Sequence, residues 1–437
     1  MTSATTARRY IVRPAASVQG ELRVPGDKSI SHRALMLGGI ADGTTSISGF
    51  LASEDCLATL AALGALGVRI ERRQETLVRV HGAGRDGLTG PAGLLDMGNA
   101  GTAIRLLMGL LAGQRFDSTL SGDASLLRRP MERVAAPLRV MGARIDTQAG
   151  KPPVHIHGGA VLQGIDYALP IASAQVKSAL LLAALYAQGL SCVTEPAPTR
   201  DHTERMLRGF GVQLSSAAGG VSLAGGQRLT GCDIAVPGDF SSAAFFIVAG
   251  CLAARQGLTI RDVGVNPTRT GLLSMLRLMG ADIEVQPHPG PRAEPIADIH
   301  VRSGALRGIR VPEALVPLAI DEFPVFFIAA AAASGETLVT GAAELRVKES
   351  DRLAAMAAGL ATLGIECELL PDGMRLQGGA MRGGRIDSHG DHRIAMAFAV
   401  ASLIASGPIE IEDIANVATS FPGFPRVARA AGLALED

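Results

Sequence analysis

One pattern occurs six times along the chain and constrains its fold more than any other feature. Each copy has a small, polar or Gly-rich opening, an apolar helix of about 15 residues, a short strand, and a second helix that ends in Leu-Gly or Met-Gly before another strand. The copies are about 73 residues apart in a chain of 437. Their openings lie near Gly26, Gly98, Ile171, Gly238, Ile320 and Gly390.

The first helix of each copy is apolar on nearly every side, as in the segments 178–187 and 243–253. Such helices are expected to be buried, with sheets outside them. Each copy is therefore predicted to be a β-α-β-α-β-β repeat, and its last two strands a hairpin, as at Gln74-Glu75 in the first copy. Three repeats around one axis would make an α/β domain with its helices inside and its sheets outside, which we call an inside-out α/β domain. Six repeats would make two such domains.

The division between the predicted domains follows the third copy, near residues 233–237. A single N-terminal strand, Tyr10–Arg23, precedes the first copy, and we expect it to pair with the far domain. The predicted domains are therefore 1–23 with 238–437, and 24–237. Two chain crossings between them would form a hinge.

Composition excludes several classes of protein. Basic and acidic residues balance at 41 each, Trp is absent and Tyr occurs three times, which does not fit a nucleic-acid binder. The longest apolar stretches are shorter than a membrane span. Five scattered Cys form no CxxC and no zinc-type spacing with His, so no metal site is expected. Residues 1–10 contain no signal-peptide pattern, and the expected location is the cytoplasm.

Lysine is rare in a chain whose cations are otherwise arginine. The four lysines are Lys28, Lys151, Lys177 and Lys348. In a chain that otherwise uses arginine, a lysine is a candidate for a functional role that needs a compact amine, such as proton transfer. We assign this work to Lys28 and Lys348, leave Lys177 open between function and structure, and expect Lys151 to be ordinary surface in a turn.

The helix openings carry polar and charged residues that the helices themselves lack. A helix start presents free N–H groups and a positive dipole end, so Lys28, Arg33 and Arg393 at such starts imply an anion. For the Ser, Thr, Asn and Asp residues, plain N-capping explains the pattern equally well. The linking loops add further cations: Arg128, Arg129, Arg200, Arg346, Lys348 and Arg352.

These cations suit a ligand that carries phosphates and carboxylates. Two acids lie among them and are candidates for proton transfer, Asp321 before an apolar helix and Glu349 between Lys348 and Arg352. For Glu349 the alternative is an exposed helix-start acid in an ion pair.

Nine segments in this order resemble the 5-enolpyruvylshikimate-3-phosphate synthase family: PGDKSISHRAL, GNAGTAIRL, RRPMERV, ASAQVKSALLLA, TRDHTERML, IDEFP, RVKESDRL, GDHRIAMAF and TSFPGF. The resemblance covers nearly the whole chain. ASAQVKSA and TRDHTE are similar to the family's second, often glyphosate-tolerant, bacterial group. The resemblance implies two inside-out α/β domains that close on shikimate 3-phosphate and phosphoenolpyruvate, without metal or organic cofactor. We expect a monomer that binds neither nucleic acid nor membrane.

The resemblance also implies site residues. Lys28, Asp321 and Glu349 match catalytic positions: the lysine between both substrates, the base at the sugar-ring hydroxyl and the proton donor. The implied shikimate 3-phosphate ligands are Lys28, Ser29, Arg33, Ser173, Ala174, Gln175, Arg200, Asp321 and Lys348. The implied phosphoenolpyruvate ligands are Lys28, Gly101, Arg129, Gln175, Arg352 and Arg393.

Two positions depart from the pattern of the family's first group: Glu344 replaces an Asn and Thr419 a Lys. Three alternatives remain open. UDP-N-acetylglucosamine enolpyruvyl transferases share the fold but use a Cys in the loop that here holds Arg128 and Arg129. RNA 3′-phosphate cyclases share the repeat. A catalytically inactive anion-binding protein would bind the ligands without releasing phosphate.

Overall fold

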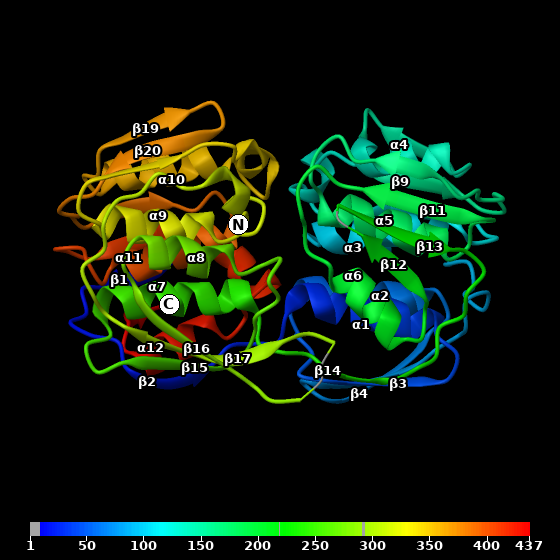
Figure 1. The fold of residues 1–437 in the computed structure, drawn as a ribbon, viewed down its shortest axis with the longest axis horizontal. Coiled ribbons are helices and arrows are strands. Elements are labelled where there is room, and N and C mark those ends of the chain that lie inside the picture. Colours follow the sequence, from blue (N-terminus) through cyan, green and yellow to red (C-terminus); the bar gives the residue numbers. More distant parts are fainter. Residues whose placement is uncertain (1–8, 218, 291–292) are drawn as a thin grey trace, which may run out of the picture. The chain divides into compact units, whose positions relative to one another are not determined.

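A computed structural model describes residues 9–217, 219–290 and 293–437 of the chain. The described residues divide into two compact units (Figure 1). The first unit comprises the described residues within 1–25, 237–291 and 295–437, and the second those within 26–236 and 292–294. Within these ranges no helix combines the length and the apolar character needed to cross a bilayer. The expectation about a signal peptide falls mostly on residues 1–8, outside the described part.

The second unit contains three copies of the repeat. Its helices are α1 (Lys28–Ile40), α2 (Glu54–Ala65), α3 (Gly101–Ala112), α4 (Glu132–Val140), α5 (Ala174–Ala184) and α6 (His202–Gly209). One sheet has the order β14 (Asp233–Ala235), β3 (Thr44–Ser48), β5 (Leu77–His81), β4 (Arg69–Gln74). The next has β6 (Leu95–Asp96), β7 (Ser118–Ser121), β9 (Lys151–His157), β8 (Arg144–Gln148). The third has β10 (Asp166–Ala168), β11 (Leu190–Thr194), β13 (Gly220–Ala224), β12 (Leu214–Ala217).

The first unit repeats this arrangement. Its helices are α7 (Phe240–Ala253), α8 (Gly271–Leu278), α9 (Phe323–Ala332), α10 (Arg352–Thr362), α11 (His392–Ala401) and α12 (Phe424–Ala431). One sheet has the order β16 (Asp282–Pro287), β17 (Ile296–Arg302), β15 (Leu258–Gly264), β2 (Gly20–Arg23). A three-stranded sheet has β18 (Glu336–Val339), β20 (Gly373–Gln377), β19 (Cys367–Leu370). The last has β21 (Gly384–Asp387), β22 (Ile409–Glu412), β1 (Tyr10–Arg13), β23 (Ala434–Glu436).

The first helix of each repeat is buried, as its composition predicts. In α7, α9 and α11 almost every residue is out of contact with solvent, including those that begin the helix. Because these helices have no polar face, only enclosure by sheets and second helices removes their surface from water. The predicted two-unit, inside-out α/β architecture is confirmed, and the hairpin predicted at Gln74-Glu75 joins β4 to β5.

The N-terminal segment corrects one prediction. The single strand expected over 10–23 is two strands, β1 and β2, and both belong to the first unit. β2 runs parallel to β15 of the fourth repeat, whereas β14, which precedes the fourth repeat in sequence, runs parallel to β3 of the first. The two repeats have therefore exchanged their leading strands. β1 lies between β22 and β23 and completes the sixth repeat.

Close helix contact in the second unit depends on Gly109 of α3. A Cβ atom built there would lie 2.0 Å from the backbone oxygen of Ala179 in α5, and backbone cannot move aside as a flexible side chain can. Gly64 of α2 is a contrasting helical glycine, exposed and with no atom within 4 Å of a built Cβ.

We expect Gly109→Ala to lower the free energy of unfolding by about 1–3 kcal/mol, because α3 and α5 must separate to admit the methyl group. The matched variant Gly64→Ala should raise it by roughly 0.4–1 kcal/mol through the entropy of the unfolded chain. Denaturant unfolding of both variants measures the difference. Equal stability of the two would contradict the packing argument.

Candidate active site

In the first unit, Asp321 lies among three cations. It precedes α9, and its carboxylate is 3.2 Å from Nη1 of Arg352, 3.8 Å from Nζ of Lys348 and 3.9 Å from Nη2 of Arg393. Arg393, in the first turn of α11, also donates to the Asp321 backbone oxygen over 3.2 Å. Residues far apart in sequence thus meet because three helix starts of the unit are brought together.

Arg352 organises this part of the unit. Its side chain is 1% exposed, and it donates from Nε to Asp391 over 2.8 Å and from Nη2 to Glu349 over 2.6 Å. Burial acts to lower the pKa of Arg352, but the carboxylates of Asp391, Glu349 and Asp321 outweigh burial and raise the pKa. The guanidinium therefore remains charged and holds all three carboxylates at defined positions.

Asp391 both accepts a hydrogen bond from Arg352 and caps α11. Besides accepting from Arg352, its carboxylate accepts the backbone N–H of Arg393 and caps α11. Ser350 donates to the same carboxylate over 3.1 Å. This fully buried acid therefore links α10, α11 and the loop that carries Glu349.

Lys348 lies between two carboxylates, those of Asp321 and Glu344, the latter at 3.7 Å. Burial lowers the pKa of Lys348, and the two acids only partly offset this effect. Glu344 thus stands beside a candidate site lysine.

In the second unit, Lys28 begins α1, which Asp27 caps by accepting the backbone N–H of Ile30. The Lys28 ammonium is 2.9 Å from Oδ2 of Asp55, at the start of α2. One turn further into α1, burial, together with the nearby charges of Lys28 and Arg33, lowers the pKa of His32 to about 3. His32 is therefore neutral in the folded chain and accounts for none of the cationic character of this helix start.

The buried side chain of Arg33, also in α1, forms hydrogen bonds within the second unit. It donates to the hydroxyls of Thr203 and Ser178 at 2.7 and 2.8 Å, and to the backbone oxygen of Ser29 at 2.9 Å. Burial is the largest effect on its pKa and lowers it to about 10, and the charge of Arg200 contributes in the same direction. Both arginines therefore lie within electrostatic reach of each other near the start of α1.

The starts of α3 and α5 are joined through Gln175. Its side-chain oxygen accepts from Arg105 over 2.8 Å, and its amide nitrogen donates to Thr102 over 3.0 Å. Ser173 caps α5, of which Ala174 is the first residue. The candidate residues 173–175 therefore lie at the helix start, where unpaired backbone N–H groups attract anions.

Arg129 approaches the start of α3 from the loop after β7. It donates to the side-chain oxygen of Asn99 over 2.5 Å and to Ser125 over 3.2 Å. A Cβ built on Gly101, the first residue of α3, would be 2.7 Å from Nη1 of Arg129 and 3.2 Å from Nη1 of Arg105. Gly101 thus lets both guanidinium groups approach the helix backbone.

Other cations of the sequence have structural partners or face solvent. Lys177 is buried and pairs with Glu195 at 3.0 Å and Glu204 at 2.8 Å, which favours the structural reading. Arg346 holds Asp351 and two backbone oxygens, and Arg128 is exposed. Lys151 is exposed as expected, but it begins β9 instead of lying in a turn.

The sequence did not single out Asp55, and it indicated Asn99 and Asp391 only as parts of helix openings. A capping acid before an apolar helix gives no sign that it also accepts from an arginine 39 positions away. Thr419 is buried and donates to the backbone oxygen of Asn416, so its own turn uses its hydroxyl.

Each unit thus gathers arginine, lysine, amide and helix N-terminal N–H groups at its helix starts. These groups donate hydrogen bonds and bind anions such as phosphate and carboxylate. The first unit adds the carboxylates of Asp321 and Glu349, which can exchange protons with a bound molecule.

We expect Asp391→Asn to lower the free energy of unfolding by about 3 kcal/mol, because it leaves the buried Arg352 short of a carboxylate. Asp42→Asn, which breaks the exposed pair with Arg228, should cause no measurable loss. Thermal and denaturant unfolding provide the comparison. A fully stable Asp391→Asn protein would show that Arg352 does not depend on Asp391.

Comparison with known proteins relates these features to an enzyme family. The family model described as EPSP synthase (3-phosphoshikimate 1-carboxyvinyltransferase) matches residues 12–428. A 3-phosphoshikimate 1-carboxyvinyltransferase of Methylococcus capsulatus is 60% identical over 97% of both chains. One from Alkalilimnicola ehrlichii is 61% identical over 98% of this chain and 96% of its own. The solved structure of EPSP synthase from Acinetobacter baumannii has a TM-score of 0.87 and 52% identity, covering 98% of this chain and 99% of that one. The chain belongs to the EPSP synthase family.

Proposed function

We propose how the residues of this chain divide the work of its reaction. The enzyme is a 3-phosphoshikimate 1-carboxyvinyltransferase. It transfers the enolpyruvyl group of phosphoenolpyruvate to shikimate 3-phosphate, giving 5-enolpyruvylshikimate 3-phosphate and phosphate in aromatic amino-acid biosynthesis. The observation that carries this conclusion is the family match over residues 12–428.

Shikimate 3-phosphate binds at the starts of α1 and α5. The proposal is supported by the cationic and N–H-rich character of these helix starts and by the position of Arg200 near Arg33. The residues assigned to this substrate are Lys28, Ser29, Arg33, Ser173, Ala174, Gln175, Arg200, Asp321 and Lys348.

Phosphoenolpyruvate carries a carboxylate and a phosphate, so its ligands are mainly arginines, which bind such groups through paired hydrogen bonds. The bond between Arg105 and Gln175 supports a fixed orientation of the Gln175 amide. The residues assigned to this substrate are Lys28, Gly101, Arg129, Gln175, Arg352 and Arg393.

The reaction is an addition followed by an elimination. The substrate hydroxyl adds to the central carbon of phosphoenolpyruvate while a proton reaches its methylene and makes it a methyl group. The tetrahedral ketal then loses phosphate and one proton of this methyl group. Asp321 takes the hydroxyl proton, and Glu349, assisted by Lys28, delivers and recovers the methylene proton. The arginines stabilise the charge on the phosphate as it leaves. The contacts of Asp321 and Glu349 with Arg352 support this assignment, because they hold both acids in place.

Four further points complete the proposal. The domains are 1–23 with 238–437, and 24–237. The protein acts as a monomer, works in the cytoplasm, and binds neither nucleic acid nor membrane. The balanced charge supports the last point.

A phosphate-release assay with both substrates tests the function directly. Phosphate should appear only when shikimate 3-phosphate and phosphoenolpyruvate are present together. An inactive anion-binding protein would bind both molecules and release none. Activity on UDP-N-acetylglucosamine in place of shikimate 3-phosphate would favour the sister family.

We expect Glu349→Gln to bind both substrates but to lose about 10²–10⁴-fold in turnover, because an amide cannot deliver the methylene proton. In deuterated water it should not exchange deuterium into the methylene of phosphoenolpyruvate. Asp321→Asn should also be slow, with its defect at the hydroxyl. Normal exchange in the Glu349 variant would assign the methylene proton to another group.

We expect wild-type protein to be inhibited by glyphosate in competition with phosphoenolpyruvate, since Gly101 leaves room for this longer molecule. Gly101→Ala should raise the inhibition constant more than the phosphoenolpyruvate KM, because the added methyl group crowds the longer molecule more than the shorter substrate. Gly93→Ala, where a built Cβ has no atom within 4 Å, is the control and should change neither. If wild-type protein resists millimolar glyphosate, Gly101 does not decide sensitivity, and the replacement of the family lysine by Thr419 becomes the position to test.

A further inference from the structure

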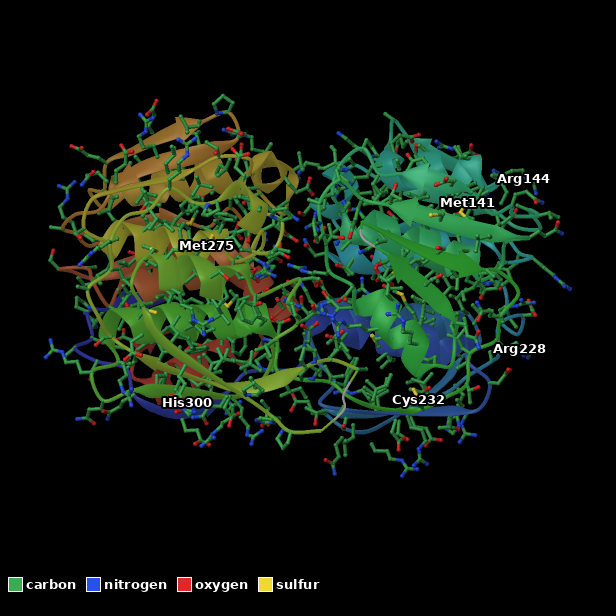
Figure 2. All side chains as sticks on the ribbon, in the orientation of Figure 1. Met141, Arg144, Arg228, Cys232, Met275 and His300 are labelled. Atoms are coloured by element: carbon green, nitrogen blue, oxygen red, sulfur yellow. The ribbon has the colours of Figure 1, made fainter. Side chains whose placement is uncertain are left out.

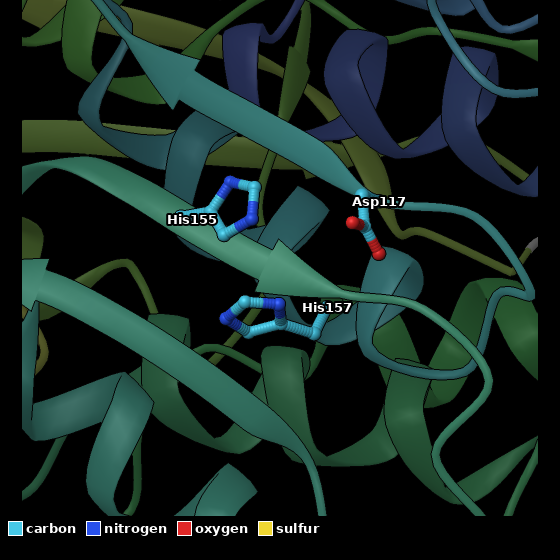
Figure 3. A group of neighbouring side chains, drawn as sticks. All are labelled: Asp117, His155 and His157. Atoms are coloured by element: carbon cyan, nitrogen blue, oxygen red, sulfur yellow. The ribbon is translucent and has the colours of Figure 1, made fainter.

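Asp117, His155 and His157 gather on the outer face of the sheet β6-β7-β9-β8 (Figure 3). Along β9, Val154 and Ile156 are fully buried, so the two histidines between and after them face the opposite, half-exposed side. Ser118 of β7 pairs with Ile156, which places the preceding Asp117 beside His157. Folding therefore joins two histidines of one strand to an acid from its neighbour.

The ligand atoms of the three side chains are slightly farther apart than they would be around a bound metal ion. Each offers one nitrogen or oxygen atom, and these atoms all lie within 4.8 Å of one another. The imidazole centroids are 4.4 Å apart with the rings at 87°. Ligands about 2.1 Å from a common metal ion lie roughly 3–3.5 Å apart, so side-chain shifts on the order of 1 Å would close the set.

A second layer of hydrogen bonds orients each side chain. His155 Nδ1 is 2.9 Å from Oγ1 of Thr119, and His157 Nε2 is 2.8 Å from Oδ2 of Asp146. Asp117 Oδ1 accepts the backbone N–H of Gly158 over 2.9 Å. These contacts leave the other ring nitrogens, Nε2 of His155 and Nδ1 of His157, for a ligand. A carboxylate that accepts from the far nitrogen of a histidine is the usual support of a metal-binding imidazole.

The charges also suit a divalent cation. The Asp117 carboxylate accepts the backbone N–H of Gly158 and lies beside both imidazoles, so it places an acidic group among the candidate ligand atoms. A second carboxylate, that of Asp146, lies 2.8 Å from Nε2 of His157 and adds an acidic group beside the site. Arg144 begins β8, an edge strand of this sheet, and is the cross-strand neighbour of His157 (Figure 2). Its Nη2 donates to the backbone oxygen of Gly158 over 2.7 Å.

A second group of side chains with ligand spacing lies in the first unit, and there arginine side chains pair with the carboxylates. Asp262, His288 and Asp298 also offer three closely spaced ligand atoms. There, however, Arg261 is 2.6 Å from Asp298, and Arg23 pairs with Asp262. Both carboxylates are therefore already neutralised by arginine, which leaves little attraction for a metal ion.

We propose that Asp117, His155 and His157 form a binding site for one borderline divalent metal ion of the Zn²⁺ class, with Asp146 and Thr119 as the residues that orient the histidines. Two imidazoles and one carboxylate are ligands that Zn²⁺, Co²⁺ and Ni²⁺ accept. The site is separate from the residues assigned to the reaction. Bound metal would join β7 to β9 and stabilise the folded chain, since the unfolded chain does not hold these residues together.

The test uses the full chain without a histidine tag, stripped with a chelator and dialysed. Calorimetric titration with ZnCl₂ should give one ion per chain, and the unfolding temperature should rise with added Zn²⁺. His155→Ala and His157→Ala should each weaken binding at least about 100-fold, and Asp146→Asn about 10-fold. His300→Ala is the matched control: its Nδ1 also meets a threonine, Thr259, at 2.8 Å on a sheet of the first unit, and Zn²⁺ binding should not change.

Asp117→Asn removes the charge of a proposed ligand and keeps the shape of its exposed side chain. This variant should fold even if a histidine variant does not. The absence of stoichiometric Zn²⁺ binding, or unchanged binding in folded His157→Ala and Asp117→Asn proteins, would overturn the proposal. Co²⁺ gives an independent readout, because the visible bands expected from nitrogen and oxygen ligands should vanish in His157→Ala. A strong near-ultraviolet thiolate band would assign the ion to cysteine and also reject the site.

Discussion

The buried helices at the centre of each repeat impose the main constraint on this structure. α7, α9 and α11 have no polar side, so they must be enclosed completely, and sheets and second helices supply the enclosure. Enclosure leaves the helix starts as the places where polar groups of these helices can serve a ligand. The same burial that stabilises each unit therefore concentrates N–H groups, caps and cations at the positions that we propose for the reaction.

The buried Arg352 shows how packing and chemistry depend on each other. A guanidinium that is 1% exposed is stable only with carboxylates around it, and Asp391, Glu349 and Asp321 provide them. Two of these acids are assigned to proton transfer, and the third caps α11. The orientation of the acids is thus a consequence of keeping a charge inside the protein.

The repeat also creates features outside the residues that we assign to the reaction. Thr119 meets His155, and Thr259 meets His300, at related places in two different repeats. Only the first of these pairs belongs, within the described residues, to a group with ligand spacing, because Asp117 and His157 lie beside it. Small differences between copies of one repeat can therefore give a single copy a separate property.

The sequence by itself determined the repeat, the inside-out α/β class and the family, because apolar periodicity and short motifs are local patterns. It also pointed to the helix starts that carry Lys28, Gly101 and Arg393. Only the tertiary structure decided that β2 and β14 exchange repeats, since both strands have similar patterns and their partners lie more than 180 residues away. Likewise, the pairing of Lys28 with Asp55 and of Arg352 with Asp391 depends on which helix starts meet. The sequence around a charged residue does not indicate its distant ion-pair partner, so these contacts are decided by how the helices pack.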